Sequence, residues 1–179
     1  MGILLYILIG FLSLVLLIVI IGFLSPRNVK VTRSLKMKSS PEAAFGQMVD
    51  LKAFVANWSP WAEKDPEAIN TFSGAEQGVG AVFEWKGHPK KVGQGRMEVT
   101  SVKPYTEVLS SLEFTGRGKA TAVFHIEDLG NGEILVQWGF EADNGMNPAA
   151  RIFGRFMDKL MGPDFEHGLK KLQNTIEKN

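Results

Sequence analysis

Cysteine is absent from this chain of 179 residues. Its absence excludes disulfide bonds, thiolate metal ligands and a cysteine nucleophile, and it is neutral on the cellular compartment. Histidine is scarce as well: His88, His125 and His167 are the only three, and no two of them have the spacing of a metal site. The sequence therefore predicts that the protein uses no metal and no cofactor.

The motifs of the common enzyme classes are missing too. There is no nucleophile elbow or Walker loop, and the Gly-x-Gly triplets that begin at Gly78, Gly93 and Gly116 lack the third glycine of a dinucleotide-binding loop. His125 is expected on the polar face of a strand, beside Glu113 in a neighbouring strand. A general acid–base pair would use such a contact, but a solvated cross-strand pair explains it more simply. We predict no catalytic residue from the sequence.

Charge is missing from the run between Ile3 and Leu24. As a helix this run would extend roughly 33 Å, enough to cross a hydrocarbon core of about 30 Å. A cleaved signal peptide fits less well, because no basic residue precedes the run and residues 22–26 make a poor cleavage site. We therefore interpret residues 1–26 as a retained transmembrane anchor that crosses the membrane once.

Positive charge gathers directly after the anchor. Residues 27–38 carry five basic side chains and no acidic one, whereas residues 39–179 hold 15 basic and 19 acidic side chains, a net charge of −4. The positive-inside rule then places the N-terminus outside and the following domain in the cytoplasm. Because that domain is net acidic, the sequence argues against nucleic-acid binding. The basic residues either contact anionic lipid head groups or face solvent on a strand. The predicted membrane-surface residues are Arg27, Lys30, Arg33, Lys36 and Lys38.

Most of the remaining chain has the hydrophobic period of β-strands. Residues 28–38 alternate between apolar and polar side chains, with Arg33 as an exception on the apolar face. Two short helices are expected next, and they end at the aromatic turn 58–61. From about residue 68 the period is again two, and short turns join the strands, which indicates an antiparallel meander. The predicted strands are 68–74, 79–87, 93–102, 107–115, 119–128 and 132–142.

Residues 147–179 predict one long amphipathic helix. Asn147 suits the N-cap and Pro148 the first helical position. Apolar residues recur at helical spacing on both sides of Gly162-Pro163, where the proline removes a backbone hydrogen bond and should bend the helix. An apolar stripe of this length requires a large apolar surface to cover it.

The meander offers that surface, because its strands collect large apolar side chains on one face and polar side chains on the other. The C-terminal helix is the only expected element long enough to cover the apolar face. We therefore predict an α+β fold: a curved antiparallel sheet of about seven strands wrapped around the C-terminal helix, with two short helices after the first strand. One transmembrane helix precedes this domain.

Several residue groups accompany this order of elements. They are Trp58-Ser59-Pro60-Trp61, Gly78-Val79-Gly80 before Phe83-Glu84-Trp85, Trp138, Met161-Gly162-Pro163-Asp164-Phe165 and Gly168-Leu169. Together they resemble the helix-grip fold of the START/polyketide-cyclase-like superfamily, also called SRPBCC, over about residues 28–178. The resemblance implies an apolar cavity between sheet and helix, which relatives use for lipids, isoprenoids, sterols and polyketides. Some relatives catalyse cyclisation or dehydration, whereas others carry a ligand or bind other proteins.

The sequence leaves open whether the aromatic residues of the apolar face fill a solid core or line a cavity. A bent sheet around a kinked helix favours a cavity, and Ser110 is the clearest uncharged polar residue expected inside it. The candidate cavity-lining residues are Trp58, Trp61, Phe83, Trp85, Met97, Ser110, Leu112, Phe114, Phe124, Trp138, Phe153, Phe156 and Leu160.

The leading hypothesis is that residues 28–179 form a membrane-anchored domain that binds an apolar small molecule, such as a lipid, an isoprenoid or a polyketide-like compound. One alternative is an enzyme of the polyketide cyclase/dehydratase type, which an inward-facing titratable residue such as Arg33 or Glu98 would favour. Another is a tethered module without a cavity that binds an unknown protein partner.

Overall fold

The structure is a computed structural model that describes residues 2–116 and 118–177. In chain order its elements are α1 (Gly2–Leu24), β1 (Asn28–Lys38), α2 (Pro41–Val49), α3 (Leu51–Ala53), the π-helical turn η1 (Phe54–Trp58), α4 (Pro60–Lys64), β2 (Ile69–Gly74), β3 (Ala81–Lys86), β4 (Gln94–Lys103), β5 (Glu107–Phe114), β6 (Gly118–Gly130), β7 (Glu133–Asp143), α5 (Pro148–Gly154) and α6 (Met157–Ile176).

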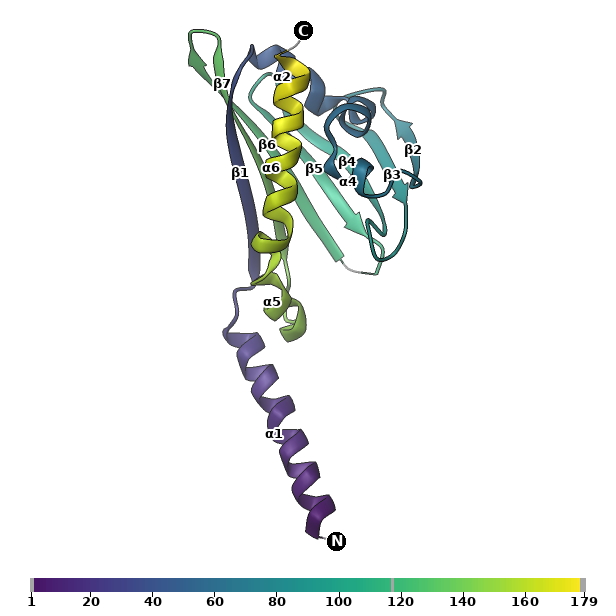
Figure 1. The fold of residues 1–179 in the computed structure, drawn as a ribbon, viewed down its shortest axis with the longest axis vertical. Helices are drawn as coiled ribbons and strands as arrows, with labels where there is room; N and C mark the ends of the chain where they lie inside the picture. Colours follow the sequence, from purple (N-terminus) through teal and green to yellow (C-terminus); the bar gives the residue numbers. More distant parts are fainter. Residues whose placement is uncertain (1, 117, 178–179) are drawn as a thin grey trace.

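The strands form one seven-stranded antiparallel sheet in the order β1-β7-β6-β5-β4-β3-β2. α6 runs across this sheet, and the short helices α2 to α4 lie beside α6 (Figure 1). The predicted α+β helix-grip architecture is confirmed. Every strand after α4 begins and ends within two residues of its expected position, because the alternation of apolar and polar residues marks each strand clearly.

The antiparallel order gives the sheet two distinct ends. The register pairs Asn28 with Asp143, Phe114 with Gly118, and Lys86 with Gln94. These strand ends lie, together with α5, on the side from which α1 leaves the domain (Figure 1). We call this side the anchor end. The far end, on the opposite side, carries the β6–β7 turn and the C-terminal end of α6.

The far end is filled by a solid core. Side chains from the sheet, α2 and the second half of α6 meet there and exclude solvent almost completely. They are Met37, Met48, Val108, Ile134, Val136, Leu169 and Leu172. The part of the concave face near the anchor end lies outside this core. There the sheet faces η1, α4, α5 and the start of α6.

The C-terminal region consists of two helices, so the prediction of one helix bent at Gly162-Pro163 was wrong. The break lies at residues 155–156, where Arg155 and Phe156 donate backbone hydrogen bonds to the carbonyl oxygens of Ile152 and Phe153, three residues earlier. α6 continues through Pro163. The carbonyl of Lys159, which the proline leaves without a helical partner, belongs to an exposed residue and can be hydrated.

Packing of α5 against the start of the sheet determines where the break occurs. A β-carbon on Gly154 would lie 2.5 Å from Val29 Cγ2 and 2.7 Å from Asn144 Nδ2. Only glycine permits this close approach. α5 therefore packs against β1 at the anchor end, and α6 runs from there along the sheet in a different direction.

α1 is long and apolar enough to cross a membrane, and its apolar span is exposed along its length. Its last turn contacts α5. A β-carbon on Gly22 would lie 2.3 Å from Pro148 Cβ, so the two helices touch at this glycine. Arg151, which is 9% exposed, donates to the carbonyl oxygen of Phe23 at 3.4 Å and lies 5.6 Å from the centre of the Phe23 ring. Arg151 thus caps the C-terminus of α1, where free carbonyl groups favour a cation.

The basic residues of 27–38 do not surround the end of α1. β1 leads away from α1, and at about 3.3 Å per residue Lys36 lies roughly 30 Å along the strand from Arg27. Lys36 and Lys38 therefore lie at the far end, whereas Arg27 lies beside the end of α1. Three of the basic residues pair with acidic residues of the neighbouring strand β7: Arg27 with Asp143 (2.5 Å), Lys30 with Glu141 (2.9 Å) and Lys36 with Glu133 (2.6 Å).

Candidate functional site

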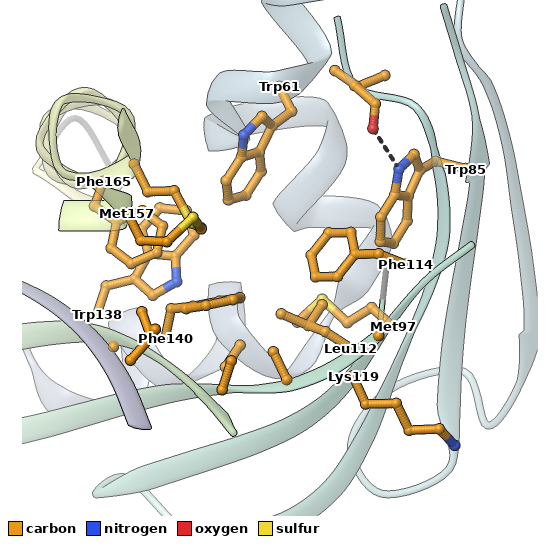
Figure 2. A pocket seen from close by; sticks show the side chains of 18 of the residues that line it. Trp61, Trp85, Met97, Leu112, Phe114, Lys119, Trp138, Phe140, Met157 and Phe165 are labelled. Atoms are coloured by element: carbon orange, nitrogen blue, oxygen red, sulfur yellow. Dashed lines mark hydrogen bonds between the residues drawn. The ribbon is translucent and has the colours of Figure 1, made fainter. Parts of the chain in front are cut away.

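A cavity of about 760 Å³ occupies the half of the concave face that the solid core leaves free. The sheet supplies one side of the cavity, mainly through β3 to β7, and η1, α4, α5 and the first turns of α6 supply the other. Figure 2 shows Trp61, Trp85, Phe114, Trp138 and Met157 around this space. The volume lies in the range of small-molecule binding sites, about 300–1,000 Å³.

Small residues leave the space empty. Ala120 and Ala122 of β6 and Ala142 of β7 face the cavity from the sheet, and Ala149 and Ala150 face it from α5. Phe124, Trp138 and Phe140 complete the cavity wall on these two strands. Beyond them the concave positions carry Ile126, Val136 and Ile134, and there the core is solid. The cavity thus depends on the alanines of β6, β7 and α5, because larger side chains at these positions would fill it.

Trp85 forms the wall at the β3–β4 side. Its indole N–H donates to the carbonyl oxygen of Val92 at 3.1 Å (Figure 2), which ties the ring to the β3–β4 turn. Gly95 on the neighbouring strand makes room for the ring, because a β-carbon there would lie 2.3 Å from Trp85 Cζ2. Phe114 packs edge-on against the same ring at 5.8 Å. Trp85 is therefore a fixed part of the wall.

Trp138 forms the inner end of the cavity. Its ring stacks on Phe165 of α6, with the ring centres 4.4 Å apart and the planes parallel within 1°. Trp61 of α4 meets Trp138 edge-on at 5.5 Å. Gly168 permits α6 to cross this close, since a β-carbon there would lie 2.6 Å from Trp138 Cζ3.

Titratable groups line the cavity only at its margin. Within the described residues they are Lys119 and Asp143, at the start of β6 and the end of β7. Lys119 pairs with Glu113, and its ammonium group points away from the aromatic side chains (Figure 2). Asp143 accepts hydrogen bonds from Arg27 Nε and from the backbone N–H of Gly145, both at 2.7 Å. These contacts lower the pKa of the Asp143 carboxyl to about 2, so it is ionised at neutral pH.

Most of the predicted site residues lie in the cavity wall. These are Trp61, Phe83, Trp85, Met97, Leu112, Phe114, Phe124, Trp138 and Phe153. Two others lie deeper in the protein. Trp58 is fully buried behind the wall and donates its indole N–H to the carbonyl oxygen of Gln47 at 3.3 Å. Ser110 is fully buried outside the cavity lining, and its hydroxyl has no hydrogen-bond partner among the described residues.

Phe156 and Leu160 do not line the cavity, and each is 54% exposed. The helix break at residues 155–156 turns α6 relative to α5, so the apolar stripe of α5 is not continued in phase. Met157, Met161 and Phe165 face the cavity instead. Their spacing of four residues is visible in the sequence. The sequence also contains the stripe of Phe153, Phe156 and Leu160, and only the position of the helix break shows which stripe faces the cavity.

The polar residues that could have indicated catalysis are paired elsewhere. Arg33 faces α6 and donates to Asp158 Oδ1 at 2.8 Å and to Glu166 Oε1 at 2.7 Å; these carboxylates raise the pKa of its guanidinium and lie outside the cavity lining. Glu98 pairs with Arg96 at 2.6 Å.

The histidines lie at the surface. His125 is exposed, and its cross-strand neighbour on β5 is Glu107. The expected neighbour Glu113 was wrong: it lies six positions along the register, opposite Lys119. His167 pairs with Glu63 at 2.7 Å, and both side chains are more than half exposed. Within residues 2–116 and 118–177, no group of three His, Cys, Asp or Glu side chains could hold a metal ion.

A family model described as "Polyketide cyclase / dehydrase and lipid transport" matches residues 28–177. The chain belongs to this family. Its matched region begins at β1 and ends just after α6, so the polyketide cyclase/dehydrase and lipid transport domain is the whole of the folded unit that follows α1. This membership confirms the resemblance seen in the sequence.

Solved structures of the same fold come from different proteins. A point mutant of norcoclaurine synthase from Thalictrum flavum, bound to a transition-state analogue, has a TM-score of 0.60 and 12% identity over 84% of this chain and 95% of its own. The Aha1 dimer from Colwellia psychrerythraea has a TM-score of 0.54 and 16% identity over 83% and 96%. Protein CV1439 from Chromobacterium violaceum has a TM-score of 0.56 and 15% identity over 85% and 99%. At these identities the likeness shows the fold alone. No curated protein matches the chain significantly.

Proposed function

We propose that the protein is a membrane-anchored binding domain that holds an apolar small molecule of the lipid class between its sheet and α6. The observation that carries the proposal is the cavity of about 760 Å³, whose interior is lined by aromatic and aliphatic side chains. Burial of apolar surface contributes about 25 cal/mol per Å², so such walls favour ligands held by shape and apolar contact.

The positions of the acids and bases favour binding over catalysis. Bond-making requires an acid, a base or an oxyanion donor directed at the reacting atoms. Among the described residues, Lys119 and Asp143 are the titratable side chains of the lining, and both have ion-pair partners at the margin. A tethered protein-interaction module is less consistent with the cavity, because such a module needs no internal space.

The polar groups of the lining suit a ligand with one polar end. Apart from Ser59, which lies between η1 and α4, the polar lining residues lie toward the anchor end, whereas the inner end is formed by Trp138 and Phe165. They are Asn70, Lys119, Asp143, Asn144 and Asn147. The side-chain amide nitrogen of Asn144 is buried and has no hydrogen-bond partner in the described part of the chain. It can donate to an oxygen of a ligand whose apolar part extends inward.

The membrane half of the proposal rests on α1. Its 23 residues include no charged side chain, and the positive-inside rule would place the N-terminus outside and residues 28–179 in the cytoplasm. Anchoring would keep the cavity close to a source of lipid. The words "lipid transport" in the family description agree with this proposal.

Native mass spectrometry of the full chain, released from nanodiscs, tests ligand binding. We expect a reproducible added mass that yields an apolar compound on denaturation. Ala120→Trp fills the cavity from β6 and should abolish the added mass. Thr121→Trp, one residue along on the opposite face of the strand, is the matched control and should retain it. A bare natural chain, or equal added masses in both variants, would contradict the proposal.

A further inference from the structure

The mouth of the cavity lies at the anchor end. Lining residues that are exposed to solvent mark the opening, since those deeper in the wall are covered. They are Asn70, Gly118, Lys119, Asp143, Asn147, Ala149 and Phe153. All of them belong to α5, to the segment before it, or to strand termini that the register places at the anchor end. The other end of the concave face is closed by the solid core.

An apolar surface borders this mouth. Met146, Phe153, Phe156 and Leu160 are 69%, 58%, 54% and 54% exposed, and we call them the rim patch. They lie within 15 consecutive residues that run from the turn before α5 to the second turn of α6. Toward the far end, by contrast, the exposed Val79, Tyr105 and Leu129 lie singly in or beside three separate turns. A concentrated apolar surface of this kind marks an interaction site, whereas scattered residues do not.

The joint with α1 fixes the depth of the rim patch relative to a membrane. Pro148 touches Gly22, two residues before the end of the apolar helix, and Arg151 contacts Phe23. If α1 spans a bilayer, the first turn of α5 lies where the hydrocarbon meets the head groups. The exposed cations Lys90, Arg155 and Lys159 lie in the β3–β4 turn and beside the rim patch, where they can reach anionic lipid.

We infer that the anchor end docks on the bilayer that α1 crosses, with the rim patch inserted at the acyl-chain boundary and the cavity mouth facing the lipid. This inference rests on the proposed function, because it needs α1 in a membrane. The ligand then passes between the leaflet and the cavity without crossing water. The polar end of the ligand stays near the head groups, beside the polar residues of the mouth.

The absence of cysteine makes the docking directly measurable, because a single introduced cysteine can be labelled without background. We would place an environment-sensitive fluorophore on Met146→Cys or Leu160→Cys, and on Val79→Cys or Leu129→Cys as matched controls from the far end. Each full chain is reconstituted in vesicles of phosphatidylcholine and phosphatidylglycerol that carry a nitroxide quencher on the acyl chains. We expect loss of emission for the two rim labels and none for the two controls. Equal emission at both ends would overturn the inference.

A second set of variants separates docking from ligand binding. Phe156→Asp with Leu160→Asp removes apolar surface outside the cavity lining, and Val79→Asp with Leu129→Asp is the matched control. In the Met146→Cys background, the first pair should restore emission and the second should not. Both pairs should keep the added mass in native spectra, since the cavity wall is unchanged. Quenching that persists in the first pair would also overturn docking, whereas a missing added mass in the natural chain would count against the proposed function alone.

Discussion

At the scale of single residues, Asp143 belongs to the sheet and to the cavity wall, and it contacts the segment that follows α1. It is the last residue of β7 and lies in the cavity lining. It also pairs with Arg27, which lies between the end of α1 and the start of β1. The first backbone pair between β1 and β7 is Asn28 with Asp143, and the ion pair lies directly beside it. Both side chains are about half exposed, so the pair contributes through geometry rather than through burial.

We expect acid to weaken the fold through this carboxyl. Contacts with Arg27 and Gly145 lower the pKa of Asp143 to about 2 in the folded protein, whereas an unfolded aspartate has a pKa of about 3.9. Because the folded state binds the proton less readily, the stabilising contribution is complete above about pH 4 and is lost as the pH falls toward 2. Unfolding of the full chain in detergent, followed by near-ultraviolet circular dichroism between these pH values, measures the loss.

Asp143→Asn is the control for this expectation. Other carboxylates with a lowered pKa, such as Asp158 beside Arg33, titrate in both proteins and contribute equally to both slopes. The variant should therefore be less stable at neutral pH but lose less stability on acidification. Identical slopes in the two proteins would contradict the assignment to Asp143.

At the scale of elements, the sequence predicts strands better than helix breaks. The strands of the meander follow from the alternation of side chains, which is a local property of the chain. The end of α5 depends instead on Gly154 packing against Val29 and Asn144, residues that are far away in sequence or outside the helix. Gly162-Pro163 has the local composition of a break, yet α6 is continuous there, and Gly162 leaves room for the guanidinium of Arg33.

The same distinction explains how much of the candidate site could be predicted. Strand parity identified Phe83, Leu112 and Phe124 as inward-facing, since neighbours on a strand alternate between faces. Helical phase failed for Phe156 and Leu160, because it was carried across a break that tertiary packing creates. Whether the inward-facing residues leave space depends on the small residues Ala120 and Ala122. The distance from these residues to α5 and α6 is set by tertiary packing, so the local sequence does not predict it.

The joint between α1 and α5 yields a prediction at this scale. Gly22→Leu places a side chain where even a β-carbon would lie 2.3 Å from Pro148, so α1 must separate from α5. Spin labels on Leu14→Cys and Arg155→Cys in the full chain should then give a broader and longer distance distribution by electron paramagnetic resonance.

Gly10→Leu is the matched control for this joint. A β-carbon on Gly10 meets no atom within 4 Å, so this substitution should leave the distance distribution unchanged. If Gly22→Leu also leaves it unchanged, the contact with Pro148 does not hold the two helices together, and the depth assigned to α5 loses its basis.

The whole molecule is divided into a packed half and a hollow half. The far end excludes solvent around Met37, Ile134 and Leu172, whereas the anchor end encloses the cavity between the sheet, α5 and α6. Stability and ligand binding should therefore depend on different residues. The packed half holds the sheet and α6 in place, so substitutions in the hollow half should reshape the cavity without a change of fold.

One substitution made in each half tests this division. Leu172→Ala removes a side chain that is fully buried in the solid core, and should lower the free energy of unfolding by about 2–5 kcal/mol while the cavity keeps its ligand. Leu112→Ala enlarges the cavity from β5, where the side chain is only half-buried, and should cost less stability. Its effect should instead be a change in the compound found as added mass, because a larger cavity admits a bulkier ligand. Urea unfolding of both variants and native mass spectrometry of the full chain provide the two readouts. If Leu112→Ala destabilised the protein as much as Leu172→Ala and left the bound compound unchanged, the cavity wall would be part of one continuous core.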